Sequence, residues 1–182
     1  VGRNALGTQN FATLTDSNNV AVGYQAGTAV TTAKKATLVG SEAGEALQDG
    51  DNNVAIGYQA LHSDTNGEKS TAVGAFVLST QNFSTLTDSN NTAVGYGAGN
   101  AVTTGTLNTL IGGLAGDVLT DADKNTAIGY TALSSDTLGS QSTAVGYQAL
   151  FSQNFTTATN SNNTAVGYNA GPAVTTGTSN TL

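Results

Sequence analysis

Two short acidic stretches carry the side chains that hard cations prefer. The sequence DGDNN at residues 49–53 recurs as DADKN at residues 121–125. Oxygen-bearing side chains at alternate positions of one loop are typical of Ca²⁺ sites, although the Gly and the Glu that complete an EF-hand loop are missing. The same residue types also form ordinary solvated turns, which is the simpler interpretation. The candidate metal ligands are Asp49, Asp51, Asp121 and Asp123.

Catalysis has little support in the sequence. The single histidine, His62, is replaced by Ser134 at the equivalent place in the second stretch, so no Ser/His/Asp set recurs. We therefore predict that the chain is not an enzyme and has no resident cofactor. The 5 Lys and Arg residues stand against 12 Asp and Glu residues, for a formal net charge of −7. Phosphate binding needs clustered basic residues, so nucleic acid is not an expected partner.

Aromatic side chains occupy two recurring places. Each of the six tyrosines follows a repeat glycine, where its ring would either stack on a bound sugar or pack on its neighbours along the edge of the fold. Three longer stretches begin with TQNF or SQNF. Each is predicted to be either a projecting receptor-contact loop or a loop whose Phe packs back on the fold. Their phenylalanines are Phe11, Phe83 and Phe155.

The chain is a short repeat inside a longer one. Each copy of an NTAVG-like motif ends on a glycine, and the glycines from Gly2 to Gly74 follow one another at spacings of 21, 17, 17 and 17. The same series then starts again, which makes a 72-residue superrepeat with boundaries near residues 2, 74 and 146. Repeats of this size indicate a solenoid. We interpret residues 1–182 as a single segment of a longer array.

The repeat glycines mark the ends of the expected strands. A glycine that no other residue replaces indicates positive φ or close backbone approach. These glycines are Gly23, Gly40, Gly57, Gly74, Gly95, Gly112, Gly129, Gly146 and Gly167.

The residues before each glycine predict a short β-strand. Only Val or Ile occurs one place before it and mostly Thr or Val three places before it, so β-branched residues form one face and Ala or Leu the other. A second Gly or Ala ten places on predicts a second turn, hence two short strands per coil. Coils stacked about 4.8 Å apart would place Asn over Asn in side-chain ladders. The predicted fold is an all-β, parallel β-solenoid with 17- and 21-residue coils.

The Val/Ile column predicts a contact surface, because a thin coil has no room for it inside. An apolar stripe along a whole rod is a protein-contact signature, and the simplest partner is another copy of the chain. A Thr column on the same face suggests ice binding as a weaker alternative. The predicted contacts between copies are Val22, Val39, Ile56, Val73, Val94, Ile111, Ile128, Val145 and Val166.

Columns of the NNTAVGYQA type, as in STAVGYQAL at residues 142–150, resemble known fibre repeats. They are similar to the head repeats of trimeric autotransporter adhesins and, more closely, to the repeat arrays of marine phage tail fibres. The resemblance spans essentially the whole chain. It implies a left-handed parallel β-roll, a parallel homotrimer around a common axis, and a place on the surface of a virion or a bacterial cell. Adhesin heads have shorter coils than those found here, so the loops must differ.

The expected function is therefore structural. The segment would be a rigid trimeric spacer or adhesive head of a fibre, and its outside partner would be a host cell-surface glycan or protein. The alternative is a binding module that uses Ca²⁺ or that holds glycans through Tyr and Phe. No apolar run approaches the roughly 20 residues of a membrane span.

Overall fold

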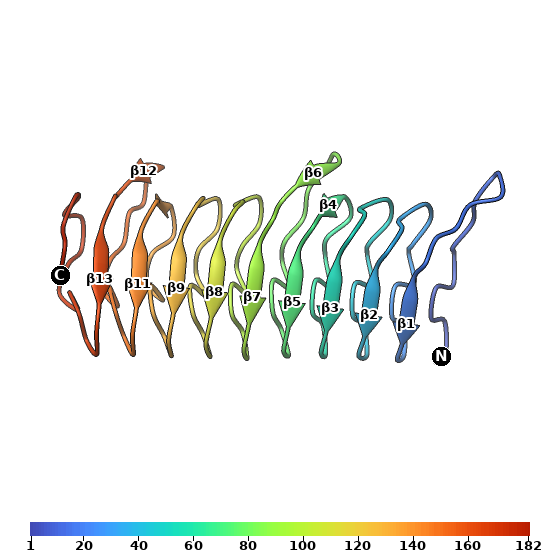
Figure 1. Ribbon diagram of the computed structural model, residues 1–182, viewed down its shortest axis with the longest axis horizontal. Helices are drawn as coiled ribbons and strands as arrows, with labels where there is room; N and C mark the ends of the chain where they lie inside the picture. The colour runs from blue at the N-terminus through green and yellow to red at the C-terminus, as the bar shows by residue number, and fades with distance from the viewer.

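The computed structural model describes residues 1–182 as a row of stacked parallel coils (Figure 1). It contains no helix, and so none that is long and apolar enough to cross a membrane. The predicted all-β parallel solenoid is confirmed. Its main sheet has nine strands: β1 (Val20–Val22), β2 (Thr37–Val39), β3 (Val54–Ile56), β5 (Thr71–Val73), β7 (Thr92–Val94), β8 (Thr109–Ile111), β9 (Thr126–Ile128), β11 (Thr143–Val145) and β13 (Thr164–Val166).

Each strand of the main sheet is the same three-residue unit in the same register. Thr71 of β5 pairs with Thr92 of β7 across a 21-residue coil, just as Thr109 of β8 pairs with Thr126 of β9 across a 17-residue coil. Successive side chains of a strand point to opposite faces. The middle Ala or Leu is therefore buried in every coil, while the flanking β-branched residues point outward.

The glycines after the strands show both of the predicted features, positive φ and close backbone approach, except that Gly167 has no close backbone neighbour. From Gly23 to Gly167 these glycines have φ between +128° and +140°, a region that other residues rarely adopt. A Cβ on Gly40 would lie 2.3 Å from the carbonyl oxygen of Gly57 in the next coil. Neighbouring coils therefore touch backbone to backbone at this corner.

Side-chain volumes inside the coils vary with the 72-residue superrepeat. The strand residue Leu38 fills the interior between Gly27 and Gly44, where an added Cβ would lie 2.5 Å and 2.7 Å from its methyl groups. The other two coils of the superrepeat carry Ala in the strand, and there Leu61 and Leu78 replace the glycine. Four different coils thus share one continuous buried core of Ala, Leu and Val.

The recurring column of asparagines forms a ladder, although not of the predicted kind. The Nδ2 atom of Asn125 donates to the carbonyl oxygen of Gly139 at 2.8 Å, and its Oδ1 accepts from the backbone N–H of Ser142 at 2.9 Å. Asn125 is fully buried, as are Asn53, Asn91, Asn108 and Asn163. The predicted bond between asparagine side chains occurs at the last pair, where Asn180 Nδ2 donates to Asn163 Oδ1 at 2.9 Å. In the coils before it the expectation is wrong, because the amide instead bonds the buried backbone groups of the next coil, which also need partners.

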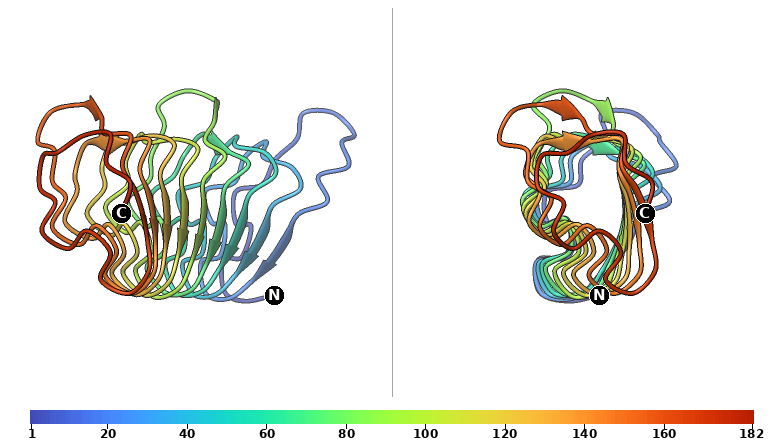
Figure 2. Two further views of the ribbon diagram at one scale, coloured as in Figure 1. Left: turned by 60° about the vertical axis from the view of Figure 1, so that its left-hand side comes forward. Right: turned by 90° about the vertical axis from the view of Figure 1, so that its left-hand side faces the viewer.

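A second strand occurs only beside the lengthened coils, so the prediction of two strands in every coil is wrong. β4 (Gly67–Glu68) pairs with β6 (Thr87–Asp88), and β10 (Gly139–Ser140) pairs with β12 (Thr159–Asn160). Other coils bond side chain to backbone at this corner, as where the N–H of Lys34 donates to Asp51 Oδ1 at 2.7 Å. In Figures 1 and 2 the β6 and β12 loops rise beyond the common outline of the coils.

Candidate functional site

The outer face of the nine-stranded sheet carries the predicted contact residues in one continuous column. Val22, Ile56, Ile111 and Val166 are exposed, and the other Val and Ile residues of the column are half-buried by their neighbours. A parallel column of Thr, with Val20 and Val54, lies on the same face. Neither column contains a charged residue. The rod therefore presents an uncharged, β-branched face along its whole sheet.

The predicted calcium ligands instead join neighbouring coils. Asp49 Oδ1 accepts hydrogen bonds from the hydroxyls of Thr31 and Thr32 in the preceding coil, at 2.6 and 2.5 Å. These bonds hold the pKa of Asp49 below its usual value of 3.8. Asp123 Oδ1 likewise accepts from the N–H and the hydroxyl of Thr106, at 2.7 and 2.9 Å.

Asp51 and Asp121 are also bonded to the preceding coil. Asp51 accepts from a backbone N–H, and Asp121 Oδ1 accepts from the hydroxyl of Thr104 at 2.6 Å. None of the four predicted ligands belongs to a group of three carboxylate or imidazole side chains close enough to share an ion. The structure thus gives these aspartates a cross-coil structural role and does not support the Ca²⁺ interpretation.

One group of metal-ligating types does come together, at a place that sequence reasoning dismissed. The ligating atoms of Glu42, Glu45 and His62 lie within 4.8 Å of one another, and His62 Nε2 is 3.0 Å from Glu45 Oε2. Gln59 Nε2 donates to Glu42 Oε2 at 2.6 Å. The side chains of Glu45 and His62 remain about one third exposed. The sequence signal for this group was the 17-residue spacing of Glu45 and His62, which places them one coil apart. The structure shows a partly exposed contact between His62 and Glu45.

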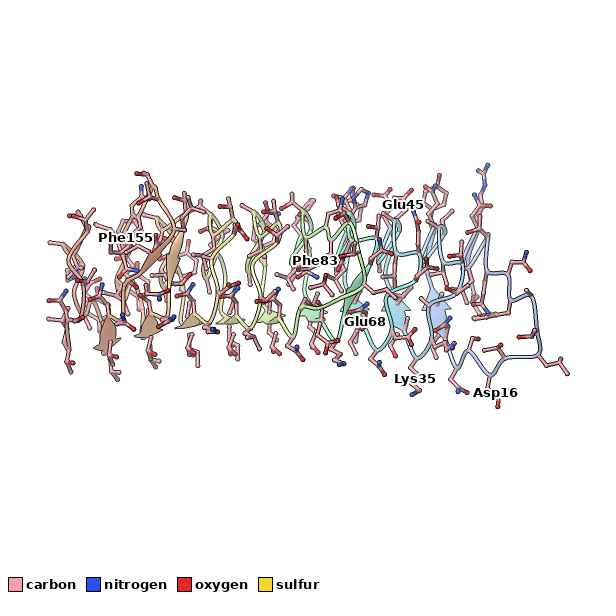
Figure 3. The ribbon with its side chains drawn as sticks, turned by 90° about the horizontal axis from the view of Figure 1, so that it is seen from above. Asp16, Lys35, Glu45, Glu68, Phe83 and Phe155 are labelled. Carbon is pink, nitrogen blue, oxygen red and sulfur yellow. The ribbon has the colours of Figure 1, made fainter.

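The lengthened coils project, but their phenylalanines do not. The Phe83 and Phe155 side chains are only 5% and 6% exposed, and Phe11 is half-buried (Figure 3 locates Phe83 and Phe155). Of the two predicted roles, burial supports packing back on the fold for Phe83 and Phe155, and contact of the loops with a receptor stays a prediction. The exposed apolar side chain of the middle loop is Leu86.

A buried polar network lies beneath each of these two loops. Gln81 Nε2 donates to Asp64 Oδ2 at 2.5 Å and to Ser70 Oγ at 2.9 Å, and Gln81 Oε1 accepts from Asn91 Nδ2 at 2.9 Å. All four side chains are fully buried. The same bonds recur one superrepeat later among Asp136, Gln153, Ser142 and Asn163.

The buried carboxylate fixes the start of the loop. Asp136 Oδ1 accepts from the backbone N–H of Gly139 and of Phe155, at 3.0 and 2.9 Å. At the equivalent Asp64, burial raises the pKa, and the hydrogen bonds from Gln81 and from backbone N–H groups offset this only in part. A pair of Asp and Gln one coil apart, recurring one superrepeat later, was the sequence signal for this network.

The tyrosine column is a partly exposed ridge. Tyr130, Tyr147 and Tyr168 stack with ring centroids 5.8 and 5.2 Å apart and interplanar angles of 17° and 9°. Near the middle of the rod the pattern changes, because Phe76 stands edge-on between Tyr58 and Tyr96. Packing on neighbouring rings, one of the two predicted roles, is what these tyrosines show.

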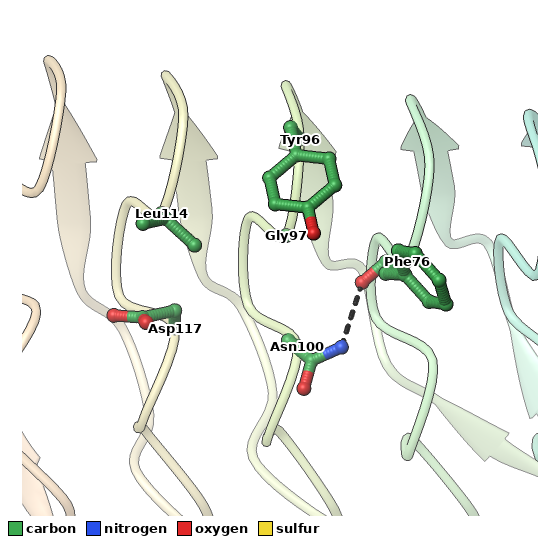
Figure 4. A pocket seen from close by; sticks show the side chains of 6 residues that line it. All are labelled: Phe76, Tyr96, Gly97, Asn100, Leu114 and Asp117. Atoms are coloured by element: carbon green, nitrogen blue, oxygen red, sulfur yellow. Dashed lines mark hydrogen bonds between the residues drawn. The ribbon is translucent and has the colours of Figure 1, made fainter.

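The molecule has a single pocket, of about 290 Å³, beside this ridge (Figure 4). Sequence reasoning missed it, although Gly97 stands where the neighbouring superrepeats have Gln25 and Asn169. The lining combines aromatic, aliphatic and polar side chains. They are Phe76, Tyr96, Gly97, Asn100, Leu114 and Asp117.

Comparison with known proteins gives no relative from which a function could be carried over. No family model, no curated protein and no solved structure matches the chain.

Proposed function

We propose that the chain is a structural segment of a surface fibre, assembled as a parallel homotrimer through the outer face of its nine-stranded sheet. The observation that carries the proposal is the unbroken Thr and Val/Ile face, which nothing in the single chain covers. Large exposed apolar patches mark protein-contact sites. The resemblance to adhesin heads and tail-fibre arrays supplies the three-fold arrangement and the setting on a virion or bacterial cell surface.

Two features of the face favour a second copy as its partner. It has no charged residue, so identical chains can approach without like-charge repulsion. Its period is that of the coils, so copies in parallel alignment would repeat the same contacts at each coil along the rod. A rod of this kind would serve as a rigid spacer, with contacts to the outside world made by the loops.

The test is the mass of the chain in solution. Sedimentation equilibrium of residues 1–182 should give three times the chain mass of 18.1 kDa. Ile111→Asp with Ile128→Asp should dissociate the trimer, because uncompensated buried charge costs about 3–5 kcal/mol. Thr156→Asp with Thr157→Asp adds the same charge on an exposed loop and should leave the mass unchanged. A stable monomer at micromolar concentration would overturn the proposal.

The same measurement separates this function from ice binding. The Thr column shares the outer face with Val and Ile, so burial in a trimer and presentation to ice exclude each other. A monomer that slows ice recrystallisation, and that loses this effect with Thr109→Leu and Thr126→Leu, would establish the alternative.

A further inference from the structure

The pocket exists because one side chain of a column is missing. Gly97 lies two places after a strand-end glycine, where the neighbouring coils carry Phe76 and Leu114. The whole column has positive φ, +63° at Gly97 and +54° at Gln25, so this backbone accepts side chains. The gap at Gly97 therefore comes from the sequence and not from a distortion of the coil.

The ring of Tyr96 forms an aromatic wall that its neighbours leave open. Tyr96 is 61% exposed, and Phe76 meets it edge-on at 6.0 Å and 85°. In the same column the adjacent coils carry Ala75 and Gly113, which have no ring to stack on it. In Figure 4 the Tyr96 ring stands above the opening, with Leu114 on one side and Phe76 on the other.

The polar atoms left over at this pocket are hydrogen-bond acceptors. Asn100 Nδ2 already donates to the carbonyl oxygen of Phe76 at 3.1 Å and to Ser79 Oγ at 2.8 Å, so only Oδ1 remains. Asp117 takes part in no ion pair and its side chain in no hydrogen bond. Its Oδ1 is buried, so the unbonded Oδ2 is the carboxylate oxygen that a ligand can reach. Burial also raises the pKa of Asp117, as expected for a carboxyl group without a counter-charge.

We propose that this pocket binds a compact organic cation with an ammonium group. A group with several N–H donors and a positive charge would satisfy Asn100 Oδ1 and compensate Asp117, and its carbon atoms would contact Leu114 and the Tyr96 ring. Ammonium groups are attracted to aromatic faces as well as to carboxylates. The ligand is either a free amine or an amino group on a larger surface molecule such as an amino sugar. The lining comes from one chain, so this proposal is independent of the homotrimer.

The test compares probes of equal shape and different charge. Saturation-transfer NMR on residues 1–182 should show n-propylammonium binding with a Kd of about 1 mM, and n-propanol binding at least about tenfold more weakly. Asp117→Asn should weaken n-propylammonium binding about tenfold. Asp121→Asn, which removes the same charge from a cross-coil bond in the same coil, should leave it unchanged.

A second variant fills the pocket. Gly97→Gln places there the residue that Gln25 already supplies one superrepeat earlier, and the nearest atom to its Cβ would be the flexible Leu114 Cδ2 at 2.9 Å. It should abolish binding while the circular dichroism melting curve stays close to that of the parent chain. Glucosamine binding more tightly than glucose would point to an amino sugar as the source, and equal binding of the two would point to a free amine. Equal effects of Asp117→Asn and Asp121→Asn, or no saturable amine binding, would also overturn it.

Discussion

Gln81 Nε2 donates a hydrogen bond of 2.5 Å to Asp64 Oδ2, which lies one coil earlier in the chain. Both side chains are fully buried. The amide of Gln81 has no freedom to reverse, because its Oε1 accepts from Asn91 Nδ2, which in turn donates to Gly105. Hydrogen bonds therefore run from Asn91 to Gln81 and from Gln81 to Asp64 beneath the projecting loop, and a second bond from Asn91 reaches the next coil.

This network predicts a pH dependence with a definite sign. The pKa of Asp64 is raised above its usual 3.8 by burial, so the folded state binds its proton more tightly than the unfolded state does. Its contribution to the free energy of unfolding should therefore increase as the pH falls from the raised pKa towards about 4, and decrease as the pH rises. Asp64→Asn should remove this component. Urea unfolding of the parent chain and of Asp64→Asn at pH 7 and about pH 4.5 measures this component of the free energy of unfolding. Identical pH dependence in the two chains would contradict the raised pKa of Asp64.

The same substitution, Asp64→Asn, should destabilise the chain at any pH. The introduced amide would turn an N–H donor either towards the Gln81 amide or towards the backbone N–H of Gly67, because both donate to Asp64. Reversing the Gln81 amide would only move the conflict to Asn91. A buried polar group left without a partner costs about 1–3 kcal/mol. Asp16→Asn changes an exposed carboxyl group and serves as the control in the same urea titration.

Gly57→Ala should be among the most damaging single changes in the chain. Its φ of +136° disfavours a side chain, and the added Cβ would lie 2.2 Å from the carbonyl oxygen of Gly74. We expect the free energy of unfolding, measured in urea, to fall by about 3 kcal/mol or more. Gly113→Ala is the matched control, because its Cβ would meet only the Tyr130 ring at 3.3 Å. If Gly57→Ala and Gly113→Ala lowered the free energy of unfolding equally, the close backbone contact between coils would not be the reason for the glycine.

Asn125→Ala should weaken the junction with the following coil. It removes the bonds to Gly139 and Ser142 and leaves two buried backbone groups without partners. Each such group should lower the free energy of unfolding by about 1–3 kcal/mol. Hydrogen exchange should show a faster Ser142 amide. Asn154→Ala, whose side chain is exposed and bonded only to the Thr137 hydroxyl at 3.2 Å, should leave that amide protected. An unchanged Ser142 amide in Asn125→Ala would contradict the ladder.

Phe83→Ala should reduce the free energy of unfolding. The side chain is 5% exposed, and truncating a buried Phe costs about 3–5 kcal/mol. Leu86→Ala, in the same loop but 59% exposed, should change the free energy of unfolding by less than about 0.5 kcal/mol. If Phe83→Ala melts like the parent chain, the ring does not anchor the loop.

Much of the fold could be predicted from the sequence because repetition multiplies a weak signal. A single Val-Gly pair does not predict a strand, but the same pair at fixed spacings predicts the strand and its register. Val94 before Gly95 pairs with Ile111 before Gly112, as this alignment requires. The positive φ of the glycines followed from the absence of any other residue in that column.

The sequence could not predict which hydrogen-bond partner a polar side chain takes, because several partners lie within reach of it around the coil. Asn125 can bond to another Asn or to backbone, and only the positions of Gly139 and Ser142 decide this. Asp49 has the residue type of a cation ligand, but its Oδ1 already accepts hydrogen bonds from two threonines of the preceding coil. The pocket escaped prediction for a related reason, since a missing side chain at Gly97 leaves no motif to find.

The constant register of the main sheet has a genetic consequence. The pairing of Thr71–Val73 with Thr92–Val94 is the same as elsewhere, although the coil between them has 21 residues. An insertion in the loop at the opposite corner therefore leaves the strand pairing of the main sheet unchanged. Unequal recombination between superrepeats would therefore add or delete four coils at a time and change the length of the rod in steps of about 19 Å. Each product would inherit intact junctions, so the length of the rod could change in a single event without selection for new packing.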